Sequence, residues 1–164
     1  MLNIRKATPN DIELINSLAW IAFPATYKNI LTPSQIDYMM EWMYSPQSLR
    51  KQMDGAHTYF LAYMEDKACG YVSVENEGGG RFHLQKIYVL PEFQGKRIGA
   101  SLFEKAKDFV RDSHPAPRIM QLNVNRSNSA LEFYKKMGMY KADEGDFDIG
   151  GGFFMNDYIM EIKL

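Results

Sequence analysis

Hydrophobic residues in the middle of the chain follow two different patterns, one typical of strands and one typical of helices. Residues 58–64 and 68–76 are rich in aromatic and β-branched side chains and are separated by the polar turn EDK, which predicts two strands. Three glycines at 78–80 then precede a third predicted strand over 81–90. From residue 98 the apolar positions instead fall at 98, 102, 106, 109 and 110, a helical spacing that predicts a helix there.

The N-terminal part carries three signals for the start of a helix. Each is a Ser or Thr followed by Pro, at positions 8, 32 and 45. Two of them have Asp11 or Gln35 three residues later, which predicts a capping box. The predicted elements are a strand over 3–7 and helices over 7–23, 31–44 and 45–53.

The C-terminal third continues the alternation of strand and helix. HPAP at 114–117 breaks the long helix, and Ser129 with Glu132 forms a predicted capping box for a helix that Gly138 closes. The predicted elements are a strand over 118–125, a helix over 130–137, and strands over 139–149 and 152–164 that pair as a terminal hairpin. This order predicts an α/β fold with a mixed sheet.

Length and composition favour a single globular domain spanning residues 1–164. The chain is 46% hydrophobic and 24% charged, and no apolar run approaches the roughly 20 residues that a membrane-spanning helix needs. The N-terminal residues lack the hydrophobic region of a secretion signal, so we expect a cytoplasmic protein with no membrane partner. Because Cys69 is the only cysteine, an internal disulfide and a cysteine-based zinc cluster are excluded, and we expect no metal site.

Charge is unevenly distributed along the chain, although its net value is only −1. That value argues against nucleic acid as a main partner. Residues 86–141 contain eleven Lys or Arg against five Asp or Glu, whereas the rest of the chain contains eight against fifteen. One segment therefore suits an anion and the remainder could suit a cation, although solvated surfaces would explain both.

A loop with two glycines and two cations, QGKRIG at 94–99, lies where a predicted strand gives way to a helix. A helix N-terminus exposes unpaired N–H groups and carries a partial positive charge. Glycine lets a ligand approach the backbone closely, so the loop predicts an anion site. Its spacing matches neither the nucleotide P-loop nor the dinucleotide-binding pattern, and a structural turn beside a solvated cationic pair would also explain it.

The wider sequence resembles the GCN5-related N-acetyltransferase (GNAT) superfamily. The resemblance rests on LQKIYVLPEFQGKRIGASLFEKA at 84–106 and on LNVNRSNSALEFYKKMGM at 122–139, and residues 94–100 match the family's Q/R-x-x-G-x-G/A motif. It implies the GNAT fold, in which a mixed, mostly antiparallel central sheet contains a splayed strand pair and is flanked by helices. It also implies an enzyme that transfers acetyl from acetyl-CoA directly to a primary amine in a ternary complex.

By this resemblance the loop would hold the pyrophosphate of coenzyme A. The implied cofactor-binding residues are Ile87, Tyr88, Val89, Gln94, Gly95, Lys96, Arg97, Ile98, Gly99, Ala100, Ser127, Asn128 and Lys136. Arg97 stands where the family usually has Gly, which implies an ordinary backbone φ and a guanidinium able to reach phosphate. The slot of the family's asparagine before the last helix holds Ser127, with Asn128 one residue later, so either could contact the cofactor.

The resemblance assigns an acid and leaves the base open. Tyr134 matches the family's tyrosine on the last helix, whose hydroxyl can donate a proton to the departing thiolate, although a plain core role would also suit it. Relatives often place a Glu base on the strand before the loop, where this chain has His83, which alternates onto the same face as Gln85 and Ile87. The alternatives for the base are Glu75, Glu77 and a chain of waters.

A finer resemblance, to the PaiA-type branch that acts on polyamines, rests on residues 23–53, 58–74 and 153–164. It implies a small amine acceptor such as spermidine. We expect carboxylates outside the cofactor segment to hold this cation, in the run Asp143, Glu144, Asp146 and Asp148. The alternatives are N-terminal acetylation of a protein, as for ribosomal proteins, and a non-catalytic acyl-CoA-binding module. A homodimer is also open.

Overall fold

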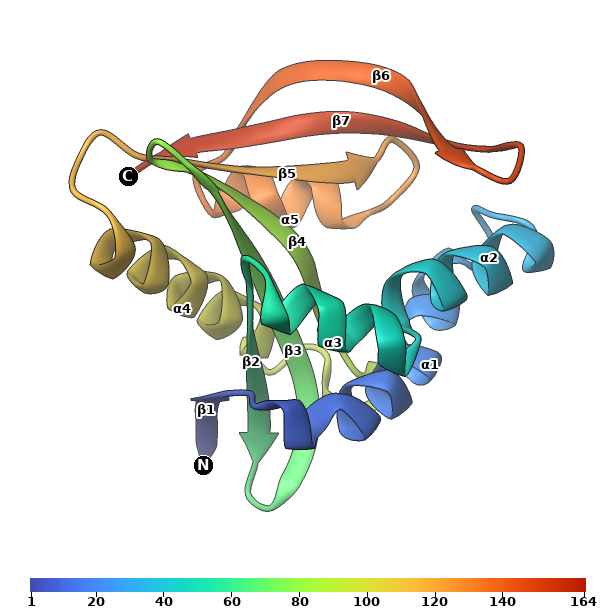
Figure 1. Cartoon of the computed structure of the whole chain (residues 1–164), viewed down its shortest axis with the longest axis horizontal. Coiled ribbons are helices and arrows are strands. Elements are labelled where there is room, and N and C mark those ends of the chain that lie inside the picture. Colours follow the sequence, from blue (N-terminus) through green and yellow to red (C-terminus); the bar gives the residue numbers. More distant parts are fainter.

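The computed structural model describes residues 1–164 as an open sheet of seven strands with helices on both faces (Figure 1). The strands are β1 (Leu2–Lys6), β2 (His57–Met64), β3 (Lys67–Gly78), β4 (Arg81–Val89), β5 (Ile119–Asn125), β6 (Tyr140–Gly150) and β7 (Phe153–Lys163). The helices are α1 (Ile12–Tyr27), α2 (Pro33–Tyr44), α3 (Pro46–Asp54), α4 (Ile98–Ser113) and α5 (Ala130–Lys136). The predicted α/β class is confirmed.

The sheet is antiparallel except at one junction. Its strand order is β1-β2-β3-β4-β5-β7-β6, and only β4 and β5 run parallel. These two strands pair over Arg81–His83 and Ile119–Gln121 alone, after which they diverge, as Figure 1 shows. The mostly antiparallel sheet with one splayed pair is therefore present as expected.

Each face of the sheet packs its own hydrophobic core. Helices α1, α2 and α3 cover one face, with Phe23, Tyr44 and Leu49 among the buried side chains, and α4 and α5 cover the other (Figure 1). The buried polar side chains of the strands all lie on the α1–α3 face: Ser73, Lys86, Asn125 and Asp157. Since buried polar groups need partners, this face differs chemically from the other.

Helix α1 extends four residues beyond its predicted end at 23. Pro24 lies inside the helix, and the amide of Lys28 still donates to the Pro24 carbonyl at 2.9 Å. Packing of Phe23 and Tyr27 into the core outweighs the hydrogen bond that the proline cannot make. This extension carries the end of α1 to the divergence of β4 and β5.

Three predicted helix caps are confirmed and one is wrong. At Thr8 the capping box with Asp11 is present, and the Thr8 amide donates to Asp11 Oδ2 at 2.8 Å. The hydroxyls of Thr32 and Ser45 accept from the amides of Gln35 and Ser48, both at 3.2 Å. Ser129, by contrast, makes no cap bond. The amide of Ala130 instead donates to Asn128 Oδ1 at 2.9 Å, so the asparagine one residue earlier opens α5 and the predicted Ser129–Glu132 box does not form.

Candidate active site

A cleft of about 1160 Å³ opens where β4 and β5 part. Its walls come from the end of α1, from β4, from the glycine-bearing loop with the start of α4, from β5, and from α5 with the residues before it. The volume slightly exceeds the usual range for drug-sized ligands, roughly 300–1,000 Å³, so a large, nucleotide-sized cofactor fits.

Most of the residues predicted from the sequence line this cleft. They are Ile87, Tyr88, Val89, Gln94, Gly95, Arg97, Ile98, Gly99, Ala100, Ser127, Asn128, Tyr134 and Lys136. Two predicted residues do not line it. Lys96 is absent from the wall, although its ammonium lies 5.5 Å from the centre of the ring of the wall residue Phe93, and His83 also lies outside the wall.

The glycine-bearing loop leaves the backbone open toward the cleft. A Cβ at Gly95 would meet nothing within 4 Å, and one at Gly99 would lie 3.6 Å from Phe133 Cζ, an ordinary contact distance. The first hydrogen bond at the start of α4 joins the Ser101 amide to the Arg97 carbonyl, so the amides of residues 98–100 have no helical partner. These free amides at the positive end of a 16-residue helix suit a phosphate group.

The backbone of Arg97 is left-handed, with φ 62° and ψ 18°, so the expectation of an ordinary φ is wrong. The chain must turn sharply here because Ile98, the next residue, is 1% exposed and fixed in the core. A side chain in this conformation costs about 1–2 kcal/mol, which glycine would avoid. Strain of this kind is typical of ligand-binding segments.

Ser127 and Asn128 both line the cleft, but their side chains differ in availability. Asn128 Oδ1 accepts from the Ala130 amide and is therefore engaged in opening α5. The Ser127 amide donates to Asn125 Oδ1 at 2.9 Å, whereas its hydroxyl makes no hydrogen bond within the protein. Ser127 therefore offers a free hydroxyl to a ligand, whereas the side-chain oxygen of Asn128 is already used within the protein.

Tyr134 on α5 faces the cleft from a buried position, 8% exposed. Its ring packs edge-on against Phe133, with ring centres 5.4 Å apart. Burial raises the pKa of its hydroxyl above the ordinary value, and the charge of Tyr27 adds to this. The phenol is therefore protonated throughout the neutral range and available as a hydrogen-bond donor.

His83 and Ile87 lie on opposite faces of the sheet, so the expectation that they share a face is wrong. Gln85 is an extra residue in β4, because the successive β3 residues Ser73 and Val74 pair with Lys86 and Leu84, and this bulge reverses the alternation along β4. His83 lies opposite Glu75 in the pairing of β3 with β4, and the side-chain amide of Gln85 donates to the Glu75 carboxylate at 2.8 Å. Burial lowers the pKa of His83, and the nearby carboxylates oppose that shift.

Lys86 is a cleft residue that the sequence reasoning missed. It is 5% exposed, and its ammonium donates to Gln52 Oε1 at 2.8 Å, to the Met43 carbonyl at 3.3 Å and to the Tyr59 hydroxyl. Its ammonium also lies 4.7 Å from the centre of the Tyr44 ring. Burial lowers its pKa to about 7. Its only signal in the sequence is a charged residue directly before the apolar residues Ile87, Tyr88 and Val89 of the strand.

The acidic run on β6 is occupied by cations of the protein itself. Arg126 donates to Glu144 at 3.0 Å and to Asp146, and Lys141 donates to Glu144 at 2.7 Å. Asp143 and Asp148 accept from neighbouring backbone amides. No residue of the run lines the cleft, so the structure does not bring these acids to the site as expected.

The cleft wall contains cations and no carboxylate. Lys28, Lys86, Arg97 and Lys136 line it, and no Asp or Glu does. No group of three or more His, Cys, Asp or Glu side chains is arranged to hold a metal ion. The wall therefore suits an anionic ligand such as a phosphorylated cofactor.

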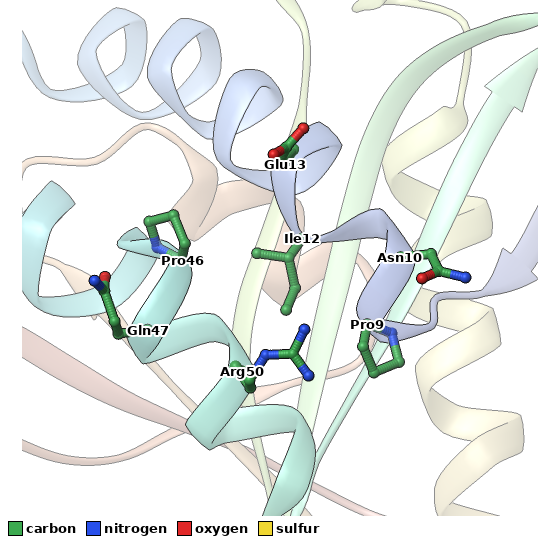
Figure 2. Close-up of a pocket in the computed structure, with 7 residues that line it drawn as sticks. All are labelled: Pro9, Asn10, Ile12, Glu13, Pro46, Gln47 and Arg50. Atoms are coloured by element: carbon green, nitrogen blue, oxygen red, sulfur yellow. The ribbon is translucent and has the colours of Figure 1, made fainter.

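A second, smaller hollow of about 440 Å³ lies between the start of α1 and α3 (Figure 2). Its lining is Pro9, Asn10, Ile12, Glu13, Pro46, Gln47 and Arg50. In Figure 2 the guanidinium of Arg50 reaches toward Pro9 and Ile12, while the Glu13 carboxylate turns away. None of the predicted site residues contributes to it, and its only charged lining residues are Glu13 and Arg50.

Comparison with protein families identifies residues 28–156 with the model of an acetyltransferase (GNAT) domain. The chain is 25% identical over 168 residues to a spermidine N(1)-acetyltransferase of Thermoplasma acidophilum, covering 99% of this chain and 97% of that protein. None of the helices has the length and apolarity needed to cross a bilayer.

Solved structures share the fold over the whole chain. A PaiA N-acetyltransferase from Thermoplasma acidophilum in complex with coenzyme A has a TM-score of 0.80 at 24% identity, covering 100% of this chain and 99% of that one. The ribosomal-protein-S18-alanine N-acetyltransferase from Escherichia coli has a TM-score of 0.75 at 17% identity, covering 99% and 94%.

Proposed function

The chain belongs to the GNAT acetyltransferase family and is an acetyl-CoA-dependent enzyme, and from this premise we propose that it transfers acetyl directly to a small-molecule primary amine. The observation that supports the proposal best is the cleft beside the start of α4. Its free helix amides and open glycines suit the pyrophosphate of acetyl-CoA, and the cations Lys28, Arg97 and Lys136 suit the remaining negative charge.

The side chains around the cleft suggest a division of roles. Arg97 and Lys136 bind phosphate, Ser127 offers a free hydroxyl to the cofactor, and the backbone of Ile87–Val89 borders the reacting group. Tyr134 donates a hydrogen bond or a proton to the departing thiolate. Acetyl-CoA supplies the energy of its thioester when bound.

A polyamine is the acceptor class that similarity supports, because the Thermoplasma acidophilum relative is named a spermidine N(1)-acetyltransferase. One observation favours a second candidate, the N-terminal amine of a protein. The cleft wall contains no carboxylate to neutralise a polycation, whereas a single amine needs less opposing charge.

Release of CoA thiol with a panel of amines tests the function. The panel is spermidine, a monoamine of similar length and a short peptide, each at low and high salt. We expect acceptor-dependent thiol release, with kcat/KM for spermidine above that for the monoamine and decreasing with salt. Release with the peptide alone would favour the second candidate, and binding of CoA without release would favour a non-catalytic module.

A further inference from the structure

The α1–α3 face of the sheet holds a buried carboxyl group to which the cofactor site assigns no role. Asp157 of β7 is 5% exposed, and its Oδ1 atom is buried without a hydrogen-bond partner. A buried carboxylate oxygen without a partner is unfavourable, and such groups are uncommon unless a ligand or water completes them. Asp157 is therefore a candidate for binding a cation.

A hydrogen bond joins Asp157 to the cleft. Asn123 lines the cleft from β5, beyond the point where β4 and β5 stop pairing, and its amide donates to Asp157 Oδ2 at 3.3 Å. Both side chains lie on the α1–α3 face, since their neighbours Leu122, Val124 and Tyr158 pack on the opposite face. Asp157 thus lies directly behind a wall residue of the cleft.

Other groups around Asp157 leave its free oxygen unsatisfied. Arg126 is the nearby cation, but its guanidinium binds Glu144 and Asp146 on β6. From α1, Tyr27 lies close enough for the charge of Asp157 to raise its pKa, and it lines the cleft. On β5, Asn125 pairs with Asp157 across the ladder but its Oδ1 accepts from the Ser127 amide.

We infer that Asp157 is the carboxylate that binds the acceptor's amine and takes its proton, an assignment that rests on the proposed acetyl transfer. The cleft wall itself has no acid, and Asp157 supplies one directly behind the wall, hydrogen-bonded to Asn123 and close to Tyr27. Burial raises the pKa of Asp157, while the Asn123 hydrogen bond and the charge of Arg126 lower it. A raised carboxyl pKa makes a better base near neutral pH.

Two protons leave the amine nitrogen during the proposed transfer. The arriving ammonium gives one proton to Asp157 Oδ1, which frees the nitrogen lone pair to bond to the thioester carbonyl carbon. The carbon–sulfur bond breaks with its electron pair on sulfur. Tyr134 donates its hydroxyl proton to that sulfur, and the second proton lost from nitrogen restores the Tyr134 hydroxyl. Asp157 then releases its proton to solvent.

The substitution Asp157→Asn tests this role, because it keeps the size of the side chain and removes the charge. We expect kcat/KM for the best amine to fall about 100-fold or more at neutral pH, with the KM for acetyl-CoA within about 3-fold of the parent. The deficit should shrink as pH rises toward the pKa of the amine, because solvent then supplies the neutral form. Asp112→Asn, an exposed acid on α4, is the matched control.

A binding measurement separates this inference from the proposed function. In calorimetric titration of spermidine into the CoA-bound protein, Asp157→Asn should weaken affinity about 10-fold or more. The assignment would be overturned if Asp157→Asn had the same kcat/KM as the parent at every pH. It would also be overturned if the variant lost amine and cofactor affinity equally and had a lower melting temperature. If the parent turns over none of the amines, the proposed acetyl transfer fails. The Asp157 site fails as well if the parent does not bind the amine, or if Asp157→Asn binds it as tightly as the parent does.

Discussion

The charge of Arg97 favours CoA binding, whereas its left-handed backbone conformation lowers the stability of the fold. Substitutions can separate these two effects. Arg97→Gly should raise the free energy of unfolding by about 0.5–1 kcal/mol, because glycine relieves the left-handed strain but adds freedom to the unfolded chain. Arg97→Ala keeps the Cβ and should give no such gain. Both should weaken CoA binding about 5- to 10-fold through loss of the cation. Urea unfolding and calorimetry measure the two effects, and equal stability of the two variants would contradict the strain.

Tyr134 allows a test of acid assistance by removal of one oxygen atom. Tyr134→Phe keeps the ring and its packing against Phe133, so cofactor affinity should change little. The turnover number should fall roughly 100-fold, since the departing thiolate loses its donor. Tyr140→Phe on exposed β6 is the control. Parent-like turnover of Tyr134→Phe in steady-state kinetics would reduce the residue to a packing role.

Lys86 should make stability depend on pH in a defined window. Its pKa is about 7 in the folded chain and 10.5 when unperturbed, so between these values the unfolded chain binds a proton that the folded chain has released. Stability therefore rises with pH across this window, and the full penalty is present below pH 7. Relative to Lys86→Met, the parent should gain roughly 2–3 kcal/mol from pH 7 to 9. The control Lys67→Met replaces an exposed lysine, so its free energy of unfolding should change with pH as that of the parent does. Urea unfolding measures both.

At the scale of elements, the junction of β4 with α4 combines a register shift with a free helix end. The bulge at Gln85 of β4 directs Lys86 and Tyr88 to the α1–α3 face and Ile87 and Val89 to the other. The strand can therefore present polar groups to an acceptor and apolar groups to a cofactor. The loop at 94–97 then positions the free amides of α4 beside the same cleft.

Substitutions at Gly99 test whether the start of α4 binds CoA. A Trp side chain would extend into the cleft, so Gly99→Trp should lose CoA affinity by about 100-fold or more while remaining folded. Gly99→Ala should bind within about 3-fold of the parent, because its Cβ would make only ordinary contacts with Phe133 and Val89. Calorimetry with CoA measures both. Unchanged affinity in a folded Gly99→Trp protein would exclude this cleft as the CoA site.

At the scale of the whole molecule, a short parallel ladder joins the two parts of the sheet. Only three residue pairs link β4 to β5, and the cleft walls beyond them belong to both parts. A ligand that contacts both walls would therefore bridge them. This arrangement predicts that the cofactor contributes to stability as well as to reaction.

Coenzyme A should raise the melting temperature of the intact chain. At about 100 times its dissociation constant it adds about 2.7 kcal/mol of stability, which corresponds to roughly 5–10 °C for a chain of this size. Thermal unfolding followed by circular dichroism measures the shift. Gly99→Trp should show none, and a parent without any shift would argue against binding in the folded state.

The sequence by itself determined the local features of this protein. Helical caps at Thr32 and Ser45, the strand–loop–helix unit at 94–100 and the family motifs depend on residues close together in the chain, so local rules predict them. Only the tertiary structure decided which side chains share a face or a partner. The bulge within β4 moved His83 away from Ile87, core packing of Ile98 imposed the left-handed Arg97, and Arg126 paired with two acids of β6. The contact of Asn123 with Asp157 depends on strand register between residues 34 positions apart, which no local pattern records.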